Sequence, residues 1–398
     1  MKICLVRHGF FPADPTLRKV AFALREANHD VDVLCLRDPG MAAFETVKGV
    51  RVFRIPLSHR RRGIGRYLME YGASFLGLTT LLTLKHMRLR YDYVQVHTMP
   101  DFLVYTAWLP RLLGTPVCIY VHEPTPELWV SKFGSDRFPW VPSFLARVQK
   151  RAVNYADCCF TVTETLRRNL GRRGADIRNI FVFHNVSSDF FDSPPPRARV
   201  PDGLFRLITH GSVEERYGHE LVLRAMHLLW HRLPGLRYDI LGEGEFRPHL
   251  TALVHKLGLQ SRVRLLGRLP LNKVRQLLSD SDACIIPMHL STYSELIDTY
   301  KMYEAVAMGK PVIISRLGGV EETFDDSCVR FINPGDCESL ADAIVDLHDH
   351  PEKRRFQTER ASARYKPMRW RRTKRTYVHQ VQTLARAATK VSGPVATH

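Results

Sequence analysis

One segment in the second half of the chain carries residue types suited to holding a nucleotide diphosphate. It reads Asp298-Thr-Tyr-Lys-Met-Tyr-Glu-Ala-Val-Ala-Met-Gly-Lys-Pro-Val-Ile-Ile-Ser315, and the predicted helix starts near Thr299. The first amides of a helix, together with the helix dipole, favour a pyrophosphate. Glu304 lies about a turn and a half into this helix, where its carboxylate could accept hydrogen bonds from two vicinal ribose hydroxyls. Lys301 and Glu304 could instead form only a surface ion pair, because they stand three positions apart.

A second block, His210-Gly-Ser-Val-Glu-Glu-Arg-Tyr-Gly218, predicts a strand, a glycine loop and a helix. Gly211 would let the backbone approach a ligand, and Arg216 could neutralise a phosphate. Any turn between a strand and a helix can contain glycine, so this pattern is weakly specific by itself.

Two segments in the first half place polar side chains directly after predicted strands. They are Val96-His97-Thr-Met-Pro-Asp101 and Tyr120-Val-His-Glu-Pro-Thr-Pro-Glu127. A lone histidine in such a place is more often a structural residue. Two such loops at one sheet edge favour a site, and we take His97, Asp101 and His122 as candidates.

The whole chain alternates apolar β-type runs with segments of helical period, which is typical of parallel sheets with crossover helices. Strands are predicted near 2–6, 31–36, 51–55, 93–97, 116–121, 158–162, 180–184, 205–210, 236–241, 263–266, 283–287, 311–315 and 328–332. Helices are predicted near 16–28, 64–88, 101–113, 141–155, 163–171, 217–232, 245–257, 272–280, 299–308 and 337–348.

The tract at 193–203 (SPPPRARVPDG) cannot continue a helix or a central strand and is the predicted linker. The predicted fold class is therefore α/β, with two Rossmann-like doubly wound domains facing a central cleft. The first, acceptor-side domain is predicted over 1–192 and the nucleotide-binding domain over 204–365. Basic terminal helices are expected over 366–398, packed back on the first domain.

The stretch Glu304-Ala-Val-Ala-Met-Gly-Lys-Pro-Val-Ile313 resembles the signature helix of the GT-B-fold retaining glycosyltransferases, specifically glycosyltransferase family 4. In that family the glutamate holds the ribose hydroxyls of a nucleotide-sugar donor, so the resemblance implies this role for Glu304. Many members carry another glutamate eight positions earlier, where this chain has Leu296, and Glu295 stands one residue out of register. Asp298 and Glu295 are both candidates to bind the donor sugar hydroxyls.

The upstream segment is more similar to a branch of the family that reads P-x-K-x-x-E-Y-x-A, with Lys301 at the lysine and Tyr300 in place of the proline. The family's G-R-x-x-x-x-K-G motif puts Arg and Lys on the diphosphate, whereas this chain has Ser212 and Tyr217 there and Arg216 displaced by one residue. The implied donor-binding residues are Gly9, Gly211, Ser212, Arg216, Arg268, Glu295, Thr299, Tyr300, Lys301 and Glu304.

In the first domain, the family has a similar H-E or H-D after the corresponding strand, where the histidine approaches the donor sugar. The resemblance therefore implies a catalytic group of His122, Glu123 and Asp298. The opening loop, His8–Arg18, resembles the family's first glycine-containing loop near donor phosphates and acceptor. It supplies Gly9, with Asp14 and Arg18 joining His97 and Asp101 on the acceptor side, although Asp14 could simply cap the helix that follows.

The resemblance implies transfer of a sugar from a nucleotide-diphosphate sugar to an acceptor hydroxyl with retention at the anomeric carbon. Backbone amides and cations would stabilise the leaving diphosphate. The chain has no D-x-D triplet of the metal-binding kind, and we expect neither a metal ion nor a cofactor. A nucleotide-sugar epimerase of the same architecture is the alternative enzyme.

The formal net charge of +18 predicts an anionic partner, and nucleic acid, acidic phospholipid and phosphorylated substrates are the candidates. No compact recognition motif is present, so a nucleic-acid partner is not expected. The basic segment Arg60–Arg66 leads into the apolar stretch Leu68–Leu84, which predicts either peripheral attachment to an anionic membrane or a helix packed inside the first domain. We expect a lipid-linked or growing cell-surface glycan as acceptor. The eight scattered cysteines favour a cytoplasmic location.

Overall fold

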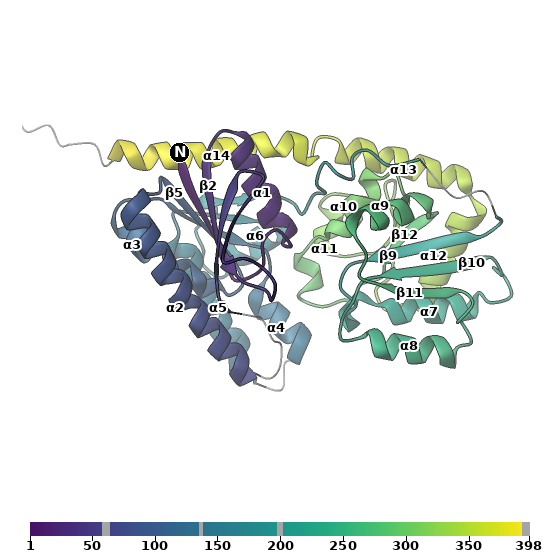
Figure 1. Ribbon diagram of the computed structural model, residues 1–398. Coiled ribbons are helices and arrows are strands. Elements are labelled where there is room, and N and C mark those ends of the chain that lie inside the picture. The colour runs from purple at the N-terminus through teal and green to yellow at the C-terminus, as the bar shows by residue number, and fades with distance from the viewer. Residues whose placement is uncertain (58–63, 135–137, 197–201, 392–398) are drawn as a thin grey trace, which may run out of the picture. The chain divides into compact units, whose positions relative to one another are not determined.

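The computed structural model describes residues 1–57, 64–134, 138–196 and 202–391 (Figure 1). The chain divides into two compact units, each built around its own sheet. Unit 1 comprises Met1–His184 and Thr373–His398, and unit 2 comprises Asn185–Arg372. Both units have the mixed α/β, Rossmann-like construction predicted from the alternating sequence pattern.

Unit 1 contains an eight-stranded sheet in the order β3-β4-β2-β1-β5-β6-β7-β8. Its pairs are parallel except for β3 with β4. The central strands are mostly apolar and buried, as expected when helices cover both faces of a parallel sheet. The strands are β1 (Lys2–Arg7), β2 (Asp30–Leu36), β3 (Phe44–Val47), β4 (Val50–Ile55), β5 (Tyr93–His97), β6 (Val117–Val121), β7 (Cys158–Thr161) and β8 (Ile180–Val182).

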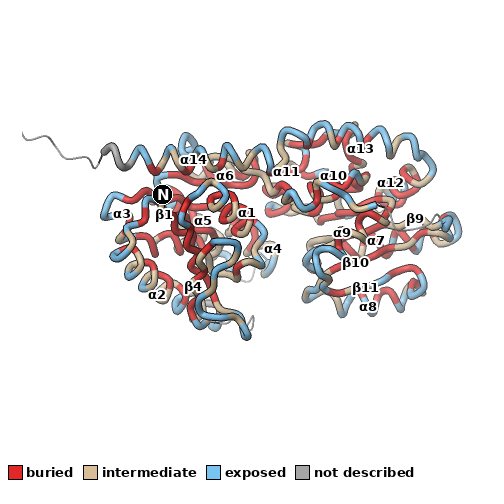
Figure 2. Tube along the Cα trace, turned by 45° about the horizontal axis from the view of Figure 1, so that its top comes forward, coloured by how far each residue is buried: buried red, intermediate tan, exposed pale blue. Residues whose placement is uncertain are grey.

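The helices of unit 1 connect these strands and cover them. They are α1 (Pro15–Glu26), α2 (Ile64–Leu89), α3 (Trp108–Leu112), α4 (Thr125–Phe133), α5 (Trp140–Tyr155) and α6 (Glu164–Arg172), with 3-10 turns η1 (Asp101–Ala107) and η2 (Ile177–Asn179). Figure 2 shows the burial that results, with the strands mostly buried and the outer faces of the helices exposed.

The last helix, α14 (Trp370–Val391), returns the end of the chain to unit 1. Tyr377, Val381 and Ala385 are buried and recur every four residues, which places them on one helix face. The Tyr377 ring packs edge-on against Phe160 and Phe183, with centroids 5.5 and 5.6 Å away. The first unit is therefore completed by a segment that begins at Thr373, far along the chain from His184.

Unit 2 contains a fully parallel six-stranded sheet in the order β11-β10-β9-β12-β13-β14. Apolar side chains such as Leu207, Ile240 and Ile313 pack with helix residues Val222 and Ile344 in one core. The strands are β9 (Phe205–His210), β10 (Leu236–Leu241), β11 (Val263–Gly267), β12 (Ala283–Ile286), β13 (Val312–Ser315) and β14 (Arg330–Ile332).

Helices again follow the strands of unit 2. They are α7 (His219–Leu228), α8 (Arg247–Lys256), α9 (Leu271–Asp280), α10 (Tyr300–Ala307), α11 (Gly318–Glu321), α12 (Cys337–Asp349) and α13 (Pro351–Tyr365), with 3-10 turns η3 (Glu215–Tyr217) and η4 (Ser294–Leu296).

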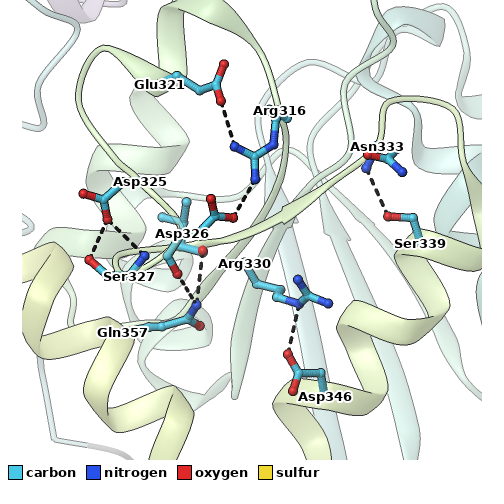
Figure 3. A network of polar contacts seen from close by, with 11 residues as sticks. Arg316, Glu321, Asp325, Asp326, Ser327, Arg330, Asn333, Ser339, Asp346 and Gln357 are labelled. Carbon is cyan, nitrogen blue, oxygen red and sulfur yellow. Dashed lines mark hydrogen bonds and ion pairs between the residues drawn. The ribbon is translucent and has the colours of Figure 1, made fainter.

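A polar network holds together the segments that flank β13 and β14 (Figure 3). Arg316 pairs with Glu321 at 2.8 Å and with Asp326 at 2.5 Å. The amide of Gln357, on α13, donates to the backbone oxygen of Asp326 at 3.0 Å, and Arg330 pairs with Asp346 of α12. These contacts tie α11, α12 and α13 to the end of the sheet.

The strand orders reverse once in each unit. In unit 1 the chain moves outward from β1 through β2 on one side and through β5 on the other, and in unit 2 from β9 through β10 and through β12. Loops leaving two such strands part in opposite directions and leave room for a ligand at their carboxyl ends. A ligand site is therefore expected at the loops after β1, β5, β9 and β12.

Most elements lie where the sequence predicts them, but β3, α11 and α4 are among those that were not predicted. β3 is a four-residue edge strand, α11 is a single turn, and α4 begins at Thr125 within a segment that contains Pro124 and Pro126. Two prolines suggested a loop, but proline is well tolerated in the first turn of a helix.

The division between the units falls after His184, eight residues before the end of the predicted first domain at 192. Contacts with unit 2 explain this position, because Asn185 bonds to Asp298 and Asp192 lies 3.6 Å from Arg369. Residues 197–201 of the predicted linker and 60–63 of the basic segment lie outside the described residues.

Gly242, at the end of β10, provides a test of the close packing at this sheet edge. A Cβ there would lie 1.7 Å from the carbonyl oxygen of Gly211, and its φ of +140° disfavours other residues. We expect Gly242→Ala to lower the free energy of unfolding by about 3 kcal/mol or more, measured by urea denaturation.

Gly258→Ala is the matched control, because Gly258 has a φ of +69° but open space around it. Only backbone strain of about 1–2 kcal/mol applies there. Equal losses in the two variants would contradict the packing argument.

Candidate active site

In unit 2, Gly211, Lys301 and Glu304 come together where β9 ends and α10 begins. The Cε atom of Lys301 lies 3.6 Å from the position that a Cβ on Gly211 would occupy, and Gly211 has a φ of +113°. Oε2 of Glu304 lies 3.3 Å from Nε2 of His210, the last residue of β9. Side chains from the end of β9 and from α10 therefore lie beside a glycine whose backbone can be approached closely.

Burial tunes the charges of this group. It lowers the pKa of Lys301 to about 8, with Arg216 adding to the effect, so the ammonium is still charged at neutral pH. Burial also lowers the pKa of His210 to about 3, with Lys301 contributing, so the imidazole is neutral. A buried, charged lysine beside a glutamate and a neutral histidine presents one strong cation to an anionic ligand.

Arg216 adds a second cation near Lys301, because both side chains contact the ring of Tyr217. The Lys301 ammonium lies 4.1 Å and the Arg216 guanidinium 5.1 Å from its centroid. Arg216 also lies 3.7 Å from Glu214 and 5.8 Å from the Tyr293 ring centroid. The structure thus brings together Arg216 and Lys301, which are two of the three cations, with Arg268, that the sequence offered for a diphosphate.

The carboxylate of Asp298, predicted as catalytic, is already engaged within unit 2. It accepts from the side-chain amide of Asn185 at 2.9 Å and from the hydroxyl of Tyr303 at 3.0 Å. Asp298 is buried, with 4% of its surface exposed. This arrangement fixes the chain just before α10.

Glu295 also makes a backbone contact, since its Oε2 accepts from the amide of Gly318 at 3.0 Å. Thr299 is the residue that precedes α10, and Tyr300 is the first residue of that helix. Ser212 is exposed directly after Gly211, whereas Arg268 is exposed after β11, at the sheet edge.

In unit 1, the two predicted histidine loops meet. Nδ1 of His97 lies 2.9 Å from Nε2 of His122, and the rings of His97, Tyr120 and His122 stack with nearly parallel planes. Burial lowers the pKa of His97 to about 3 and holds that of His122 well below its ordinary value. Both rings are neutral at physiological pH, so they act here as hydrogen-bonding groups.

Asp14 lies close enough to influence both histidines and is paired with Arg7 at 3.0 Å. Its other oxygen accepts from the amide of Leu17 at 2.9 Å and so caps α1. Burial opposes ionisation of Asp14, but Arg7 and the cap hold its pKa at about 2. Gly9 accepts from the amide of Leu36 through its carbonyl, and Arg18 donates to the carbonyl of Pro12.

Asp101 belongs to a different buried cluster. The amide of Gln149 lies 3.4 Å from both Oδ2 of Asp101 and the carbonyl oxygen of Glu123. Burial raises the pKa of Asp101 to about 7. Gln149 in turn contacts Arg173, which pairs with Glu127. The predicted acceptor-side residues therefore divide, with Asp14 near His97 and His122, and Asp101 linked to the Glu123 loop.

Sequence reasoning missed Arg7, Gln95 and Gln149, which contact the predicted site residues Asp14, His97 and Asp101. It also missed Tyr377, which contacts Gln95. Gln95 had a detectable signal, because a glutamine inside the apolar strand Tyr93–His97 must find buried partners. Gln149 and Tyr377 depend on pairings over 48 and 282 positions, whereas Arg7 pairs with Asp14 only seven positions further on.

The described residues contain neither a metal-binding cluster nor a membrane-spanning helix. No group of three or more His, Cys, Asp or Glu side chains there is arranged to hold a metal ion. None of the helices described combines the length and hydropathy needed to cross a lipid bilayer.

Two protein-family models match the chain, one over most of each unit. Residues 13–186 match the glycosyl transferase 4-like domain, and residues 205–350 match glycosyl transferases group 1. The chain belongs to the GT-B glycosyltransferases of the family 4 type, as its motifs predicted.

Curated relatives are similar over most of the chain. An alpha-D-kanosaminyltransferase of Streptomyces kanamyceticus is 23% identical over 79% of this chain and 83% of its own length. A glycogen synthase of Mycobacterium tuberculosis is 24% identical over 83% of this chain and 80% of its own length.

Solved structures share the fold. A sucrose-phosphate synthase from Thermosynechococcus elongatus superposes with a TM-score of 0.81 at 19% identity, covering 98% of this chain and 100% of its own. The Anabaena protein HepE in complex with UDP-glucose gives a TM-score of 0.73 at 15% identity, covering 96% of this chain and 99% of its own.

Asp14 offers a test that separates its ion pair from its helix cap. Asn can cap the helix but carries no charge, so we expect Asp14→Asn to cost about 2 kcal/mol at pH 7. Asp14→Ala should cost about 1 kcal/mol more, because the cap is also lost. Urea unfolding of both variants measures these losses.

The pH dependence has a definite sign. The pKa of Asp14 is lowered on folding, so its stabilisation is present above about pH 4 and is lost as the pH falls toward about 2. A gap between wild type and Asp14→Asn that does not shrink over this range would contradict the ion-pair account. Full stability with lost turnover would instead indicate contact with substrate.

Proposed function

We propose that the protein is a retaining hexosyltransferase that uses a nucleotide-diphosphate sugar without a metal ion. The proposed donor site rests on one observation: Gly211, Lys301 and Glu304 lie close together at the end of β9 and the start of α10. The strand order of unit 2 reverses between β9 and β12, where the fold leaves space for a nucleotide.

In this proposal Glu304 accepts hydrogen bonds from the two ribose hydroxyls, which fixes the nucleoside. The diphosphate lies against the backbone at Gly211 and the first amides of α10, within reach of Lys301 and Arg216. Breaking the bond between sugar and phosphate leaves an extra negative charge on the diphosphate. Fixed cations and amides stabilise that charge more strongly in a buried site than in water.

The acceptor hydroxyl attacks from the side on which the phosphate leaves, so the configuration is retained, and the leaving phosphate takes the acceptor proton. No pair of carboxylates of the glycosidase type is then needed. This fits the engagement of Asp298 by Asn185 and Tyr303, which leaves that carboxylate a structural task. In the same proposal His122 hydrogen-bonds the donor sugar.

The proposed acceptor is a lipid-linked or growing cell-surface glycan, and α2 supports it. Met69, Leu76, Leu84 and Met87 are between 56% and 77% exposed. Their spacing puts all four on one face of α2, opposite the buried Leu78 and Leu82. An exposed apolar stripe on a strongly basic protein suits attachment to an anionic membrane surface.

Glu304→Ala tests the donor site. Nucleotide sugars should raise the melting temperature of the wild type by mass action, and UDP-, GDP- and ADP-sugars are screened to find the best donor. Loss of charge-assisted hydrogen bonds worth about 1.5–3 kcal/mol should weaken binding of that donor about 10- to 100-fold. Thermal shift and calorimetry measure the change.

Glu352→Ala, at an exposed position in the first turn of α13, is the control and should bind the donor normally. Unchanged donor affinity in Glu304→Ala would remove the ribose assignment. Donor hydrolysis or epimerisation without any acceptor dependence would contradict sugar transfer.

Met69→Glu/Leu76→Glu tests the membrane proposal by vesicle flotation at low salt. The wild type should bind vesicles of phosphatidylglycerol and phosphatidylcholine. The double variant should bind at least about tenfold less, because it lacks two apolar side chains that would be buried in the membrane. Leu228→Glu, 60% exposed in unit 2, should behave as the wild type. Failure of the wild type to float would disprove the attachment.

A further inference from the structure

A line of buried polar side chains crosses unit 1 from α14 to the loop after β6. The hydroxyl of Tyr377 lies 3.0 Å from Oε1 of Gln95, and Nε2 of Gln95 lies 2.8 Å from Nε2 of His97. Nδ1 of His97 then lies 2.9 Å from Nε2 of His122. Of these four residues only His122 has as much as 9% of its surface exposed. The line therefore starts deep in the unit and ends at a predicted ligand contact.

The two tyrosines beside Gln95 determine which way its amide faces. Tyr93 donates its hydroxyl proton to the same Oε1 atom as Tyr377, also at 3.0 Å. A carbonyl oxygen has two lone pairs, so two phenol donors occupy both of them. The amide nitrogen of Gln95 must then face His97, and it can only donate.

The hydrogen bond from Gln95 determines which nitrogen carries the proton in each imidazole. A neutral imidazole has one nitrogen that donates and one that accepts. Because Nε2 of His97 accepts from Gln95, the proton of His97 is on Nδ1 and is donated to Nε2 of His122. Nε2 of His122 accepts, and its proton is consequently on Nδ1.

Nearby groups keep the two rings neutral and in place. Burial is the largest cause of the lowered pKa values of His97 and His122, and the charges of Arg7 and Asp14 also act on both rings. Stacking with Tyr120 and a hydrogen bond of 3.2 Å from the His122 amide to Oγ1 of Thr98 hold the last ring.

We propose that Tyr93, Tyr377, Gln95 and His97 are positioning residues that fix His122 as its Nδ1–H tautomer, so that His122 meets its ligand as a hydrogen-bond donor. That this ligand is the nucleotide-sugar donor rests on the proposed function. His122 then donates from Nδ1 to an oxygen acceptor, such as a sugar hydroxyl or a phosphate oxygen. It orients the ligand and transfers no proton.

The wild-type protein tests the tautomer directly. Protein labelled with ¹⁵N-histidine is examined by long-range ¹H–¹⁵N correlation, which distinguishes a protonated from an unprotonated ring nitrogen, and His97→Asn and His122→Asn assign the signals. Both rings should be Nδ1–H at neutral pH. An Nε2–H signal for His122, or a signal averaged between the tautomers, would overturn the proposal.

Tyrosine variants test the cause. Tyr377→Phe keeps the ring that packs on Phe160 and leaves Tyr93 to orient Gln95, so the Nδ1–H tautomer should persist. Tyr93→Phe/Tyr377→Phe removes both donors, and the His122 signal should then report a mixture of tautomers. An unchanged signal in a folded double variant, checked by circular dichroism, would show that the tyrosines do not set the direction.

Gln95→Glu tests the effect of the tautomer on activity. An ionised carboxylate facing His97 can only accept a hydrogen bond. His97 and His122 should both change to Nε2–H, and kcat/KM for the best donor should fall at least tenfold. Unchanged turnover with reversed tautomers would overturn the ligand-donor role. If no nucleotide sugar binds the wild type, the proposed function fails. The tautomer measurements still decide whether Gln95 and His97 position His122.

Discussion

Parallel strands end at one edge of their sheet, and this constraint determines where the molecule can hold a ligand. In unit 2 the chain runs outward from β9 in both directions, so the loops after β9 and β12 separate. Gly211 lies in the first of these loops, and Lys301 and Glu304 lie on the helix that follows the second. In unit 1 the same reversal between β1 and β5 brings the Asp14 loop near His97 and His122. The chemistry of both units thus follows from strand order.

Charge burial is handled differently in the two units. Unit 2 keeps Lys301 ionised although it is 7% exposed, with the face of Tyr217 beneath the ammonium. Unit 1 instead keeps His97 and His122 neutral and joins their rings to Gln95 and to each other by hydrogen bonds. A cation suits an anionic diphosphate, whereas neutral donors suit the hydroxyls of a sugar without competing for its protons.

The sequence was most informative where a local pattern has one structural solution. Apolar runs such as Val31–Leu36 predicted the central strands, and the segment around Glu304 predicted both the helix and the family. It was least informative where partners are distant: Gln95 and Tyr377 are 282 positions apart, and no local pattern joins them. Asp298 shows the same limit, because no local pattern joins it to Asn185, which lies 113 positions earlier.

The return of α14 to unit 1 has a consequence for biosynthesis. A ribosome makes residues 1–184 first, yet the tyrosine that closes the core of this unit is added 193 residues later. Unit 2 is continuous in the chain and has all of its strands as soon as β14 is made. The first unit to be synthesised is therefore the last to be completed. Nascent chains stopped before Tyr377 would expose an unfinished apolar face, which makes them substrates for chaperones and proteases.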